Sequence, residues 1–486
     1  MTDTATAQPA VNPFQAAPNS KKLLAVVGVY LGVMANMLVS TTNSTMLPAA
    51  AAEIGGMDIY GLAQGISGIL SVCIMPIYGF IGARNPHLKR PLAGVSLLIG
   101  AAVLLVRVFA PSMMAIIVAN VFWGVVSGGV FAIGFTIIRD VYDRKQAGVY
   151  LGLVGTFMSV AMLAGPFLGG LIIDQIGWRV WAAILCAFLL AGGLVILMSV
   201  KVTKEEAAPY AVKGGAFDYI GAVIVVIFLA ALIIVLSLGS SYVPFGSSLS
   251  NTLLVIAAIA LVAFIFWLSK KKNDCIVPLN AIKDRNTLVL SASYFFHNFG
   301  SMSISFFLAG FIMSNCANDP ITLTIGPALT AGIASALMAV LGLFLGPVFG
   351  KMIAKAGTAK TVMLIGNVAR VVVMGAFVLV LVPGVPVWLI FVLMFLAGIF
   401  NSQQTVTQSA GPQLCLVPEL RTVGNSTAQL FSNLGAGIGM AVFTLLSAAD
   451  PVNGMRNCMI VTLIVWIVNF FVPFFMKKLD PAEDDN

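Results

Sequence analysis

Two ionisable residues inside long apolar runs of this sequence could do chemistry. His297 and Arg370 each lie about ten residues from the predicted cytoplasmic end of their run, which is roughly 15 Å deep at the rise of an α-helix. A charge there costs about 2.5 to 3.5 kcal/mol, so such residues usually face a cavity or a partner. His297 could carry a proton, and Arg370 could line the cavity and attract an anionic or polar group of a solute. Two alternatives stay open: a neutral His297 bonded to a neighbour, and an Arg370 that snorkels to the inner surface.

Uncharged polar residues recur at helical spacing in the same apolar runs. Lipid offers them no hydrogen bonds, so these faces must point inward. Together they predict a polar but neutral substrate cavity, which Trp123 helps to widen; for any one residue the alternative is hydrogen bonding between helices. The faces are formed by Asn36, Ser40 and Asn43, by Gln64, Ser67 and Ser71, by Tyr294, His297, Asn298, Ser301 and Ser305, by Asn401, Gln404 and Gln408, and by Asn425, Gln429 and Ser432.

The sequence lacks the motifs of other function classes. It has no GxxxxGK[ST] loop, so ATP is not the energy source of this chain, and no HExxH motif, nucleophile elbow or metal-ligand cluster. We therefore predict no enzyme, no cofactor and no metal. The formal charge of +8 does not indicate nucleic acid, because the Lys and Arg residues form short clusters between apolar runs. The six cysteines predict free thiols, and pairing of Cys316 with Cys458 is left open.

The elements that must hold these residues are membrane helices. Apolar residues make up 59% of the 486 positions and charged residues 9%, with a mean hydropathy of +1.02, which is too apolar for a water-soluble domain. The runs are about 20 residues long, the length of a spanning helix and not of a barrel strand. The sequence predicts an all-α transmembrane protein with fourteen spans, at 23–48, 59–82, 91–109, 112–138, 147–173, 180–200, 219–239, 250–268, 287–313, 327–349, 361–382, 387–410, 422–446 and 457–476.

The basic residues predict the orientation of these spans. With the N-terminus in the cytoplasm, 22 of the 26 Lys and Arg residues fall on inner segments, and only Arg107 and Arg370 lie within spans. Both termini are therefore expected in the cytoplasm. The predicted organisation is an N-terminal tail (1–22), a six-helix bundle (23–200), a linker (201–218), two inserted spans (219–268), a cytoplasmic loop (269–286), a second six-helix bundle (287–476) and a tail (477–486).

An internal repeat supports two matching bundles. GFIGARNPHLKR at 79–90 and GKMIAKAGTAK at 350–360 each begin with glycine at the inner end of an apolar helix and end in basic residues. Repeats of this kind place a substrate site at the interface of the halves near the middle of the membrane. We predict gating roles for Gly79, Arg84, Gly350 and Lys355.

Further motifs resemble those of the major facilitator superfamily, and specifically of its fourteen-span drug:proton antiporters. AMLAGPFLGG at 161–170 resembles the antiporter motif, with Gly165, Pro166, Gly169 and Gly170 in place. GWRVW at 177–181 resembles an outer-loop signature, and TNSTMLP at 42–48 resembles the end of the first span. The glycine-rich motif has a physical meaning of its own: small residues allow close helix packing, and Pro166 bends the helix or frees a carbonyl.

The sequence also departs from that family's pattern. The aspartate of the gating loop corresponds to Ala83 in the first half and to Ala354 in the second, and the aspartate of the first span corresponds to Val39. In the fourth span, Asn120 stands at the position of an arginine and Trp123 at that of a glutamine. The resemblance implies that Asn120 and Trp123 belong to the site, but the residues of proton coupling are incomplete.

The combined prediction is a secondary transporter of the cell membrane, acting as a monomer on small amphipathic or hydrophobic solutes, which it exports by alternating access. Protons are the candidate coupling ion. Two alternatives stay open. One is facilitated diffusion or uptake of a small polar or anionic solute without protons, and the other is a receptor or scaffold in the membrane that transports nothing.

Overall fold

The computed structural model describes residues 12–56, 59–213, 217–238, 243–308, 311–312, 316, 318–381, 384–449 and 454–479. Every regular element in these ranges is helical, as predicted. Eleven helical segments within the same ranges are long and apolar enough to cross a membrane. Helices α2, α14 and α20 match three further predicted spans but are not among the eleven, so the count of fourteen stays a prediction.

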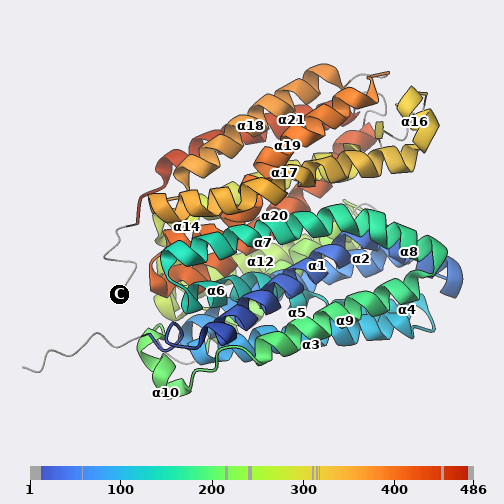
Figure 1. The fold of residues 1–486 in the computed structure, drawn as a ribbon. Coiled ribbons are helices and arrows are strands. Elements are labelled where there is room, and N and C mark those ends of the chain that lie inside the picture. The colour runs from blue at the N-terminus through green and yellow to red at the C-terminus, as the bar shows by residue number, and fades with distance from the viewer. Residues whose placement is uncertain are drawn as a thin grey trace, which may run out of the picture.

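The first half of the chain forms one group of packed helices (Figure 1). The predicted fourth span is interrupted by the π-helical turn η2, and the predicted fifth span by the π-helical turn η3. The elements are α1 (Asn19–Ile54), α2 (Tyr60–Arg84), η1 (Pro86–Leu88), α3 (Lys89–Val108), α4 (Met113–Val121), α5 (Gly124–Ser127), η2 (Gly128–Gly134), α6 (Phe135–Val141), α7 (Arg144–Ala164), η3 (Gly165–Gly169), α8 (Gly170–Gln175) and α9 (Trp178–Leu197).

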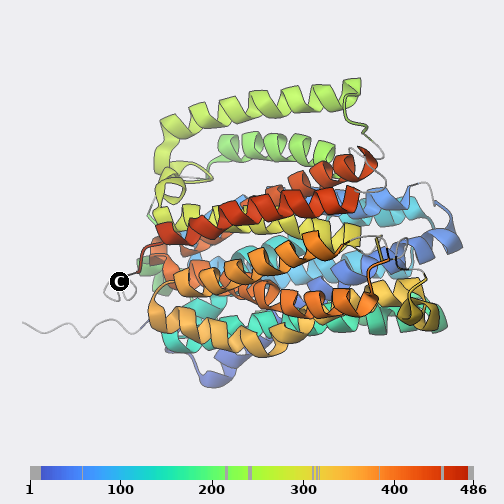
Figure 2. The ribbon, with the colours of Figure 1, turned by 90° about the horizontal axis from the view of Figure 1, so that it is seen from above.

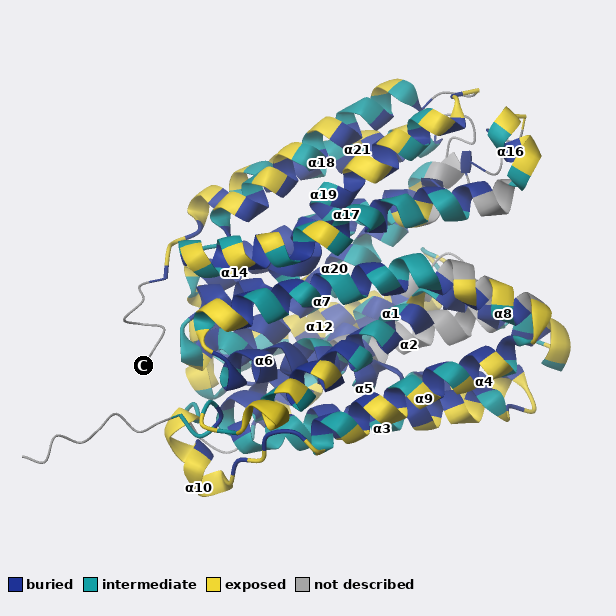
Figure 3. Ribbon diagram, viewed as in Figure 1, coloured by how far each residue is buried: buried dark blue, intermediate teal, exposed yellow. Residues whose placement is uncertain are grey.

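The last part of the chain forms the second group (Figure 1). α1 begins and η7 ends at the same end of the molecule, which we call the terminal end. Exposed residues follow the outward faces of α3, α9 and α18, where they would meet lipid (Figure 3). The elements are α13 (Leu279–Lys283), α14 (Arg285–Met302), η6 (Ser303–Phe307), α16 (Pro320–Ile325), α17 (Pro327–Ala356), α18 (Lys360–Val380), α19 (Val387–Cys415), α20 (Pro418–Ala449), α21 (Gly454–Phe471) and η7 (Val472–Phe475).

The segment between the two groups contributes α11 (Tyr219–Leu238), α12 (Ser248–Lys271) and η5 (Lys272–Asp274), which form the outer layer on one side (Figure 2). α11 packs against both α2 and α20. The buried Asp218 carboxylate accepts hydrogen bonds from Gly221 N at 3.0 Å, Trp267 Nε1 at 2.9 Å and Ile276 N at 3.0 Å. This one side chain therefore caps α11 and fixes α12 and the chain after it.

The linker before the inserted helices lies against the terminal end of the first group. It contains α10 (Lys204–Ala207) and η4 (Ala208–Tyr210), and its Val212 N donates to Ala83 O at 3.0 Å. Thr203 caps α10 in a capping box with Glu206. Hydrogen bonds from the Thr203 backbone and hydroxyl lower the pKa of Glu206.

The two groups meet along two seams, α7 with α17 and α2 with α20. Glycines allow the close approach at both. A Cβ on Gly350 would stand 2.2 Å from Gly148 O, and one on Gly79 would stand 1.9 Å from Ser426 Oγ. The close contacts of the α7–α17 seam extend along α7 to Ser159, where Gly342 is the neighbour on α17. By contrast, no atom of the described residues lies within 4 Å of the place of a Cβ on Gly332, nearer the opposite end of α17.

We predict that Gly350→Ala destabilises the protein, whereas Gly332→Ala on the same helix does not. The added methyl at Gly350 collides with backbone, and overpacking of this kind costs about 1 to 3 kcal/mol. At Gly332 the described residues leave room for a methyl group, and alanine in a helix stabilises the folded state by about 0.5 to 1 kcal/mol relative to glycine. The measurement is the melting temperature of each variant in detergent. Equal melting temperatures for the two variants would contradict the close contact at Gly350.

Candidate functional site

A buried arginine organises the polar residues of the first half. The Arg107 side chain on α3 is fully buried and donates from Nη1 to Asn43 Oδ1 at 3.0 Å. It also donates from Nε and Nη2 to Asn120 Oδ1, at 3.0 and 2.6 Å. Its guanidinium carbon lies 5.7 Å from the centroid of the Trp123 ring. Three predicted site residues are thus brought together by an arginine that sequence reasoning had placed in a span but not in the site.

The other polar residues predicted on α1 have different surroundings. Asn36 is buried and donates to Ser127 Oγ on α5 at 3.2 Å, so it joins two helices of one half. Ser40, one turn further on, is exposed although it lies in the middle of a long helix. Of the stripe predicted on α2, only Ser71 has a described side chain, and it is buried; Gln64 and Ser67 fall outside the described side chains.

A second buried arginine organises the other half. Arg370 on α18 is fully buried and donates from Nη2 to Gln403 Oε1 at 2.7 Å and to Gln404 Oε1 at 3.0 Å, both on α19. It also donates from Nη1 to Asn367 Oδ1. Its guanidinium carbon lies 6.0 Å from the Phe400 ring and 5.9 Å from the Trp466 ring. In this conformation Arg370 therefore neither reaches the inner surface nor contacts solvent.

His297 lies beside the same two rings. Its ring is parallel to that of Trp466, at 6.1 Å between centroids, and 6.4 Å from that of Phe400. Trp466 Nε1 donates to Phe296 O at 3.0 Å, and the absence of a side chain at Gly300 makes room for the indole. His297 Nδ1 is buried and has no hydrogen-bond partner among the described residues. His297 and Arg370 thus lie beside the same two aromatic rings, and a role of His297 in proton transfer stays a prediction.

The remaining predicted residues of the second half connect α14, α19 and α20. Tyr294 OH donates to Thr407 O at 2.5 Å, and both Asn298 Nδ2 and Gln408 Nε2 donate to Ser432 Oγ, at 2.7 and 3.1 Å. The buried Gln429 has no partner for its Nε2 in the part of the chain that the structure describes.

The antiporter-motif helix packs tightly on α1. A Cβ on Gly165 would stand 2.2 Å from Thr41 Oγ1, and one on Gly169 would stand 2.4 Å from Thr42 Cγ2. The motif adopts the π-helical turn η3, which widens the helix locally. The side chain of Pro166 and the surroundings of Gly170 lie outside the described part. Close packing is therefore present at two of the four positions, and a hinge function stays a prediction.

The outer-loop motif fastens helices of one half to each other. Trp178 Nε1 donates to Glu53 Oε2 at 2.6 Å, and Arg179 pairs with the same carboxylate at 3.2 Å. Arg179 Nη1 also donates to Val108 O at 2.9 Å. The end of α1, the end of α3 and the start of α9 are thus joined at one point.

The predicted gating residues act in different ways. Gly79 and Gly350 allow close helix packing at the two seams. Arg84 pairs with Asp274 at 2.9 Å and so connects α2 to the inserted segment. Lys355 is exposed.

The neighbouring Ala354 replaces the aspartate of the resembled motif, and its backbone oxygen accepts from Arg144 Nε at 3.2 Å. Arg144 Nη2 also donates to Leu414 O at 2.6 Å. An arginine on α7 thus holds α17 and α19 through neutral carbonyl groups at the terminal end.

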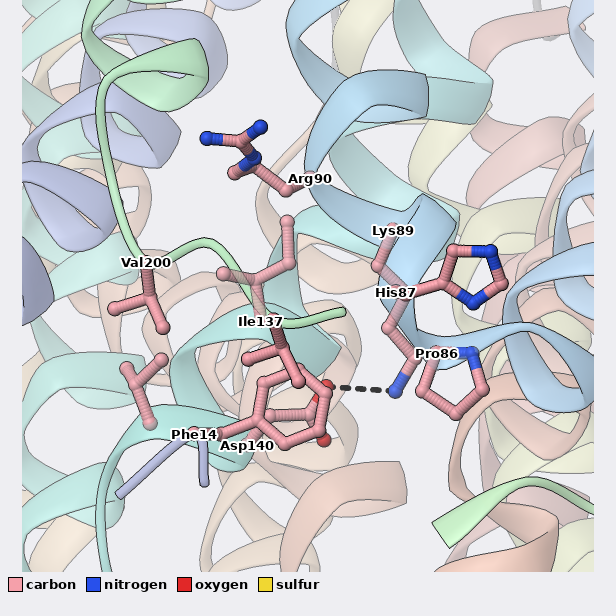
Figure 4. Close-up of a pocket in the computed structure, with 10 residues that line it drawn as sticks. Phe14, Pro86, His87, Lys89, Arg90, Ile137, Asp140 and Val200 are labelled. Atoms are coloured by element: carbon pink, nitrogen blue, oxygen red, sulfur yellow. Dashed lines mark hydrogen bonds and ion pairs between the residues drawn. The ribbon is translucent and has the colours of Figure 1, made fainter. Parts of the chain in front are cut away.

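A small surface pocket at the terminal end lies apart from these clusters (Figure 4). Lys89 Nζ pairs there with Asp140 Oδ2 at 2.7 Å. The buried Phe14 lines the pocket and packs edge-on against Tyr210, 6.3 Å between centroids. The pocket therefore anchors the start of the described chain and the linker on the helix ends.

Both polar clusters share one plan. In each half a buried arginine on one helix is bound by amide oxygens of the helix that follows it, beside an aromatic ring. The clusters belong to different halves, so the structure does not unite them into one site. No group of three metal-ligating side chains occurs among the described residues. Cys316 and Cys458 are free thiols.

Comparisons with known proteins agree with this architecture. A family model described as Major Facilitator Superfamily matches residues 29–296. Multidrug resistance protein 3 of Bacillus subtilis is 23% identical over 86% of this chain and 78% of its own length. MFS-type transporter gkaD of Penicillium citrinum is 25% identical over 58% of this chain, and Multidrug transporter protein MdtP of Bacillus subtilis is 24% identical over 60%. The chain spans about half the length of these last two relatives, 48% and 53%.

A crystal structure of the human organic anion transporter MFSD10 superposes with a TM-score of 0.62 at 15% identity, over 94% of this chain and all of the other, which shows the shared fold. The chain therefore belongs to the Major Facilitator Superfamily, whose members carry small-molecule solutes across membranes; it is a multi-pass membrane transporter that resembles the drug:proton antiporters, and not an enzyme.

Proposed function

We propose that this protein exports small amphipathic or hydrophobic solutes across the cell membrane by alternating access, with the terminal end in the cytoplasm. The names of the relatives, which include multidrug resistance and multidrug transporter proteins, support an export role. The excess of basic residues on predicted inner segments supports the orientation. The proposed spanning arrangement is two bundles of six helices, within 23–200 and 287–476, plus the inserted helices α11 and α12.

The single observation that carries this proposal is the construction of the α7–α17 and α2–α20 seams. Close contacts join the halves at the terminal end, where Gly148 meets Gly350 and Asn425 Nδ2 donates to Ala132 O at 3.1 Å. Among the described residues nothing contacts the place of a Cβ on Gly332, which supports a seam that is not continuous along α17. Apart from the Arg144 side chain, the seam contacts described above are glycine contacts and hydrogen bonds of uncharged groups, which water can replace when the halves separate. We infer a conformation closed toward the cytoplasm, from which the halves rock apart.

The polar residues support a solute that is largely apolar with a polar group. The clusters around Arg107 and Arg370 offer amides, aromatic rings and buried positive charge, and their partners in the described part of the chain are amide oxygens, not carboxylates. A cationic site of this kind attracts solutes that carry a negative charge or acceptor oxygens.

A second candidate function is facilitated diffusion or uptake of a polar or anionic solute without protons. It is favoured by the Arg144 hydrogen bond to the Ala354 carbonyl, where the resembled family has a carboxylate. Coupling one charge to transport is worth about 2.3 kcal/mol per 100 mV, so export against a gradient would benefit from a proton-carrying group. His297 is the residue in the described clusters that could provide it.

We predict that a disulfide across the α2–α20 seam stops transport. In Gly82→Cys/Thr422→Cys the new thiols face each other, because a Cβ on Gly82 would stand 3.1 Å from Thr422 Cγ2 and disulfides need Cβ atoms about 3.8 Å apart. Oxidation should reduce transport at least tenfold, and reduction should restore it, because the halves could no longer separate at the cytoplasmic end.

The control pair Gly94→Cys/Leu197→Cys joins α3 and α9 within one half, since a Cβ on Gly94 would stand 2.6 Å from Leu197 Cγ. Its oxidation should leave transport intact. Full transport by the oxidised seam pair would contradict alternating access at this interface.

We predict that dye efflux from cells or vesicles accelerates when protons are more concentrated outside. A proton that enters as the solute leaves lowers the free energy of export. The measurement is efflux of a lipophilic dye at imposed pH gradients of either sign, with equal membrane potential. Indifference to the gradient would rule out antiport and favour the second candidate.

A further inference from the structure

Two adjacent glutamines on α19 differ in how completely they are hydrogen-bonded. Gln403 and Gln404 are both buried, with 0% and 3% of their surface exposed, and both accept from Arg370 Nη2. Gln403 Nε2 goes on to donate to Thr407 Oγ1 at 2.8 Å. Gln404 Nε2 has no hydrogen-bond partner in the described structure. The same guanidinium thus holds one amide that is satisfied and one that is half satisfied.

Arg370 decides which way each amide points. A guanidinium carries N–H donors and no acceptor, so it can bind a glutamine only through the amide oxygen. The NH₂ group of Gln404 is therefore directed away from Arg370 and cannot flip without losing that bond. What Gln404 offers to a further group is a hydrogen-bond donor.

Two further unmet groups on the α19 side of Arg370 are donors, whereas an unmet acceptor, Asn469 Oδ1, lies on the side of Asn367. Asn401 Nδ2, one turn away on the same face of α19, is buried and has no partner among the described residues, and the same is true of Nε of Arg370 itself. Asn401 and Gln408, which flank Gln404 on this face, are partly exposed, so the edge of the face is accessible. Among the described residues, the bonded partners of Arg370 are all amide oxygens, which leave its positive charge without a counterion.

We propose, building on the function proposed above, that Gln404 and Asn401 form a subsite for the negatively charged oxygens of a solute head group, such as a carboxylate. Arg370 acts as the positioning residue, because it fixes the polarity of Gln404 and supplies positive charge. A carboxylate has only acceptor sites and so satisfies the unmet donors. An ammonium group has only donors, satisfies none of them and is repelled by Arg370. The transported solutes are therefore amphipathic organic anions.

The test replaces one amide NH₂ by oxygen and changes nothing else in shape. Gln404→Glu keeps an oxygen for Arg370 but removes the donor and adds a negative charge. We expect unchanged or higher thermal stability and at least a tenfold loss of transport of carboxyfluorescein, an anionic dye. Transport of ethidium, a cationic dye, should not fall.

The matched control is Gln403→Glu, which makes the same chemical change at the other amide bound to Arg370. The new carboxylate gives Arg370 a counterion but leaves the NH₂ group of Gln404 in place, so carboxyfluorescein transport should fall less than in Gln404→Glu. An equal loss in the two variants would overturn the role of Gln404 as the donor. Asn401→Asp is the second variant; its partly exposed position tolerates a charge, and it should also lose carboxyfluorescein transport.

The outcomes separate this inference from the proposed function. Wild-type protein that carries ethidium but not carboxyfluorescein would remain a transporter and overturn the subsite. Retained carboxyfluorescein transport in both Gln404→Glu and Asn401→Asp would do the same and assign the amides to helix packing alone. No flux of either dye through wild-type protein in liposomes would instead overturn the proposed function.

Discussion

A guanidinium surrounded by hydrocarbon must find oxygen atoms inside its own helix bundle, and this requirement organises both halves of the protein. Arg107 meets it with amide oxygens of two asparagines, and Arg370 meets it with amides of one asparagine and two glutamines. Aromatic rings beside each guanidinium complete the surroundings. Because a charge buried without such partners is costly, each cluster fixes several helices relative to one another. Each half therefore has a polar core that favours movement as one body.

The contacts between the halves have a different chemistry. They depend on glycines that bring backbones together and on donors that bind backbone carbonyls, as Arg144 does with Ala354 O. Such contacts are numerous but individually weak, and water can replace the hydrogen bonds when the seam opens. The contrast between halves that each contain a buried arginine cluster and seams of glycine contacts and backbone hydrogen bonds supports the proposed rocking movement.

The inserted helices add a contact that neither half has alone. α11 packs against α2 and α20 on opposite sides of one seam, and Arg84 of α2 pairs with Asp274 after α12. Leu430 and Leu434 of α20 pack against the same apolar cluster as Leu229 of α11. When α2 and α20 separate, α11 must therefore slide along one of these two helices, or α11 and α12 must move together with one of them.

The sequence by itself determined the helical class, the family and the polar faces, because hydropathy, glycine motifs and amide spacing are local properties of the chain. It also predicted Asn43, Asn120 and Trp123 as site residues, and the structure brings these three together around Arg107, while their role in a site stays a prediction. What it could not determine is the partner that unites them. Arg107 stands near the end of its apolar run, where a long side chain could equally have reached water, and only the approach of α1 and α4 to α3 decides that it turns inward. The same holds for Gln403 and Gln404, which are adjacent and identical in sequence. Their difference arises because helix packing brings one amide to Thr407 and leaves the other without a partner, and hydrogen bonding depends on distances that no residue pattern encodes.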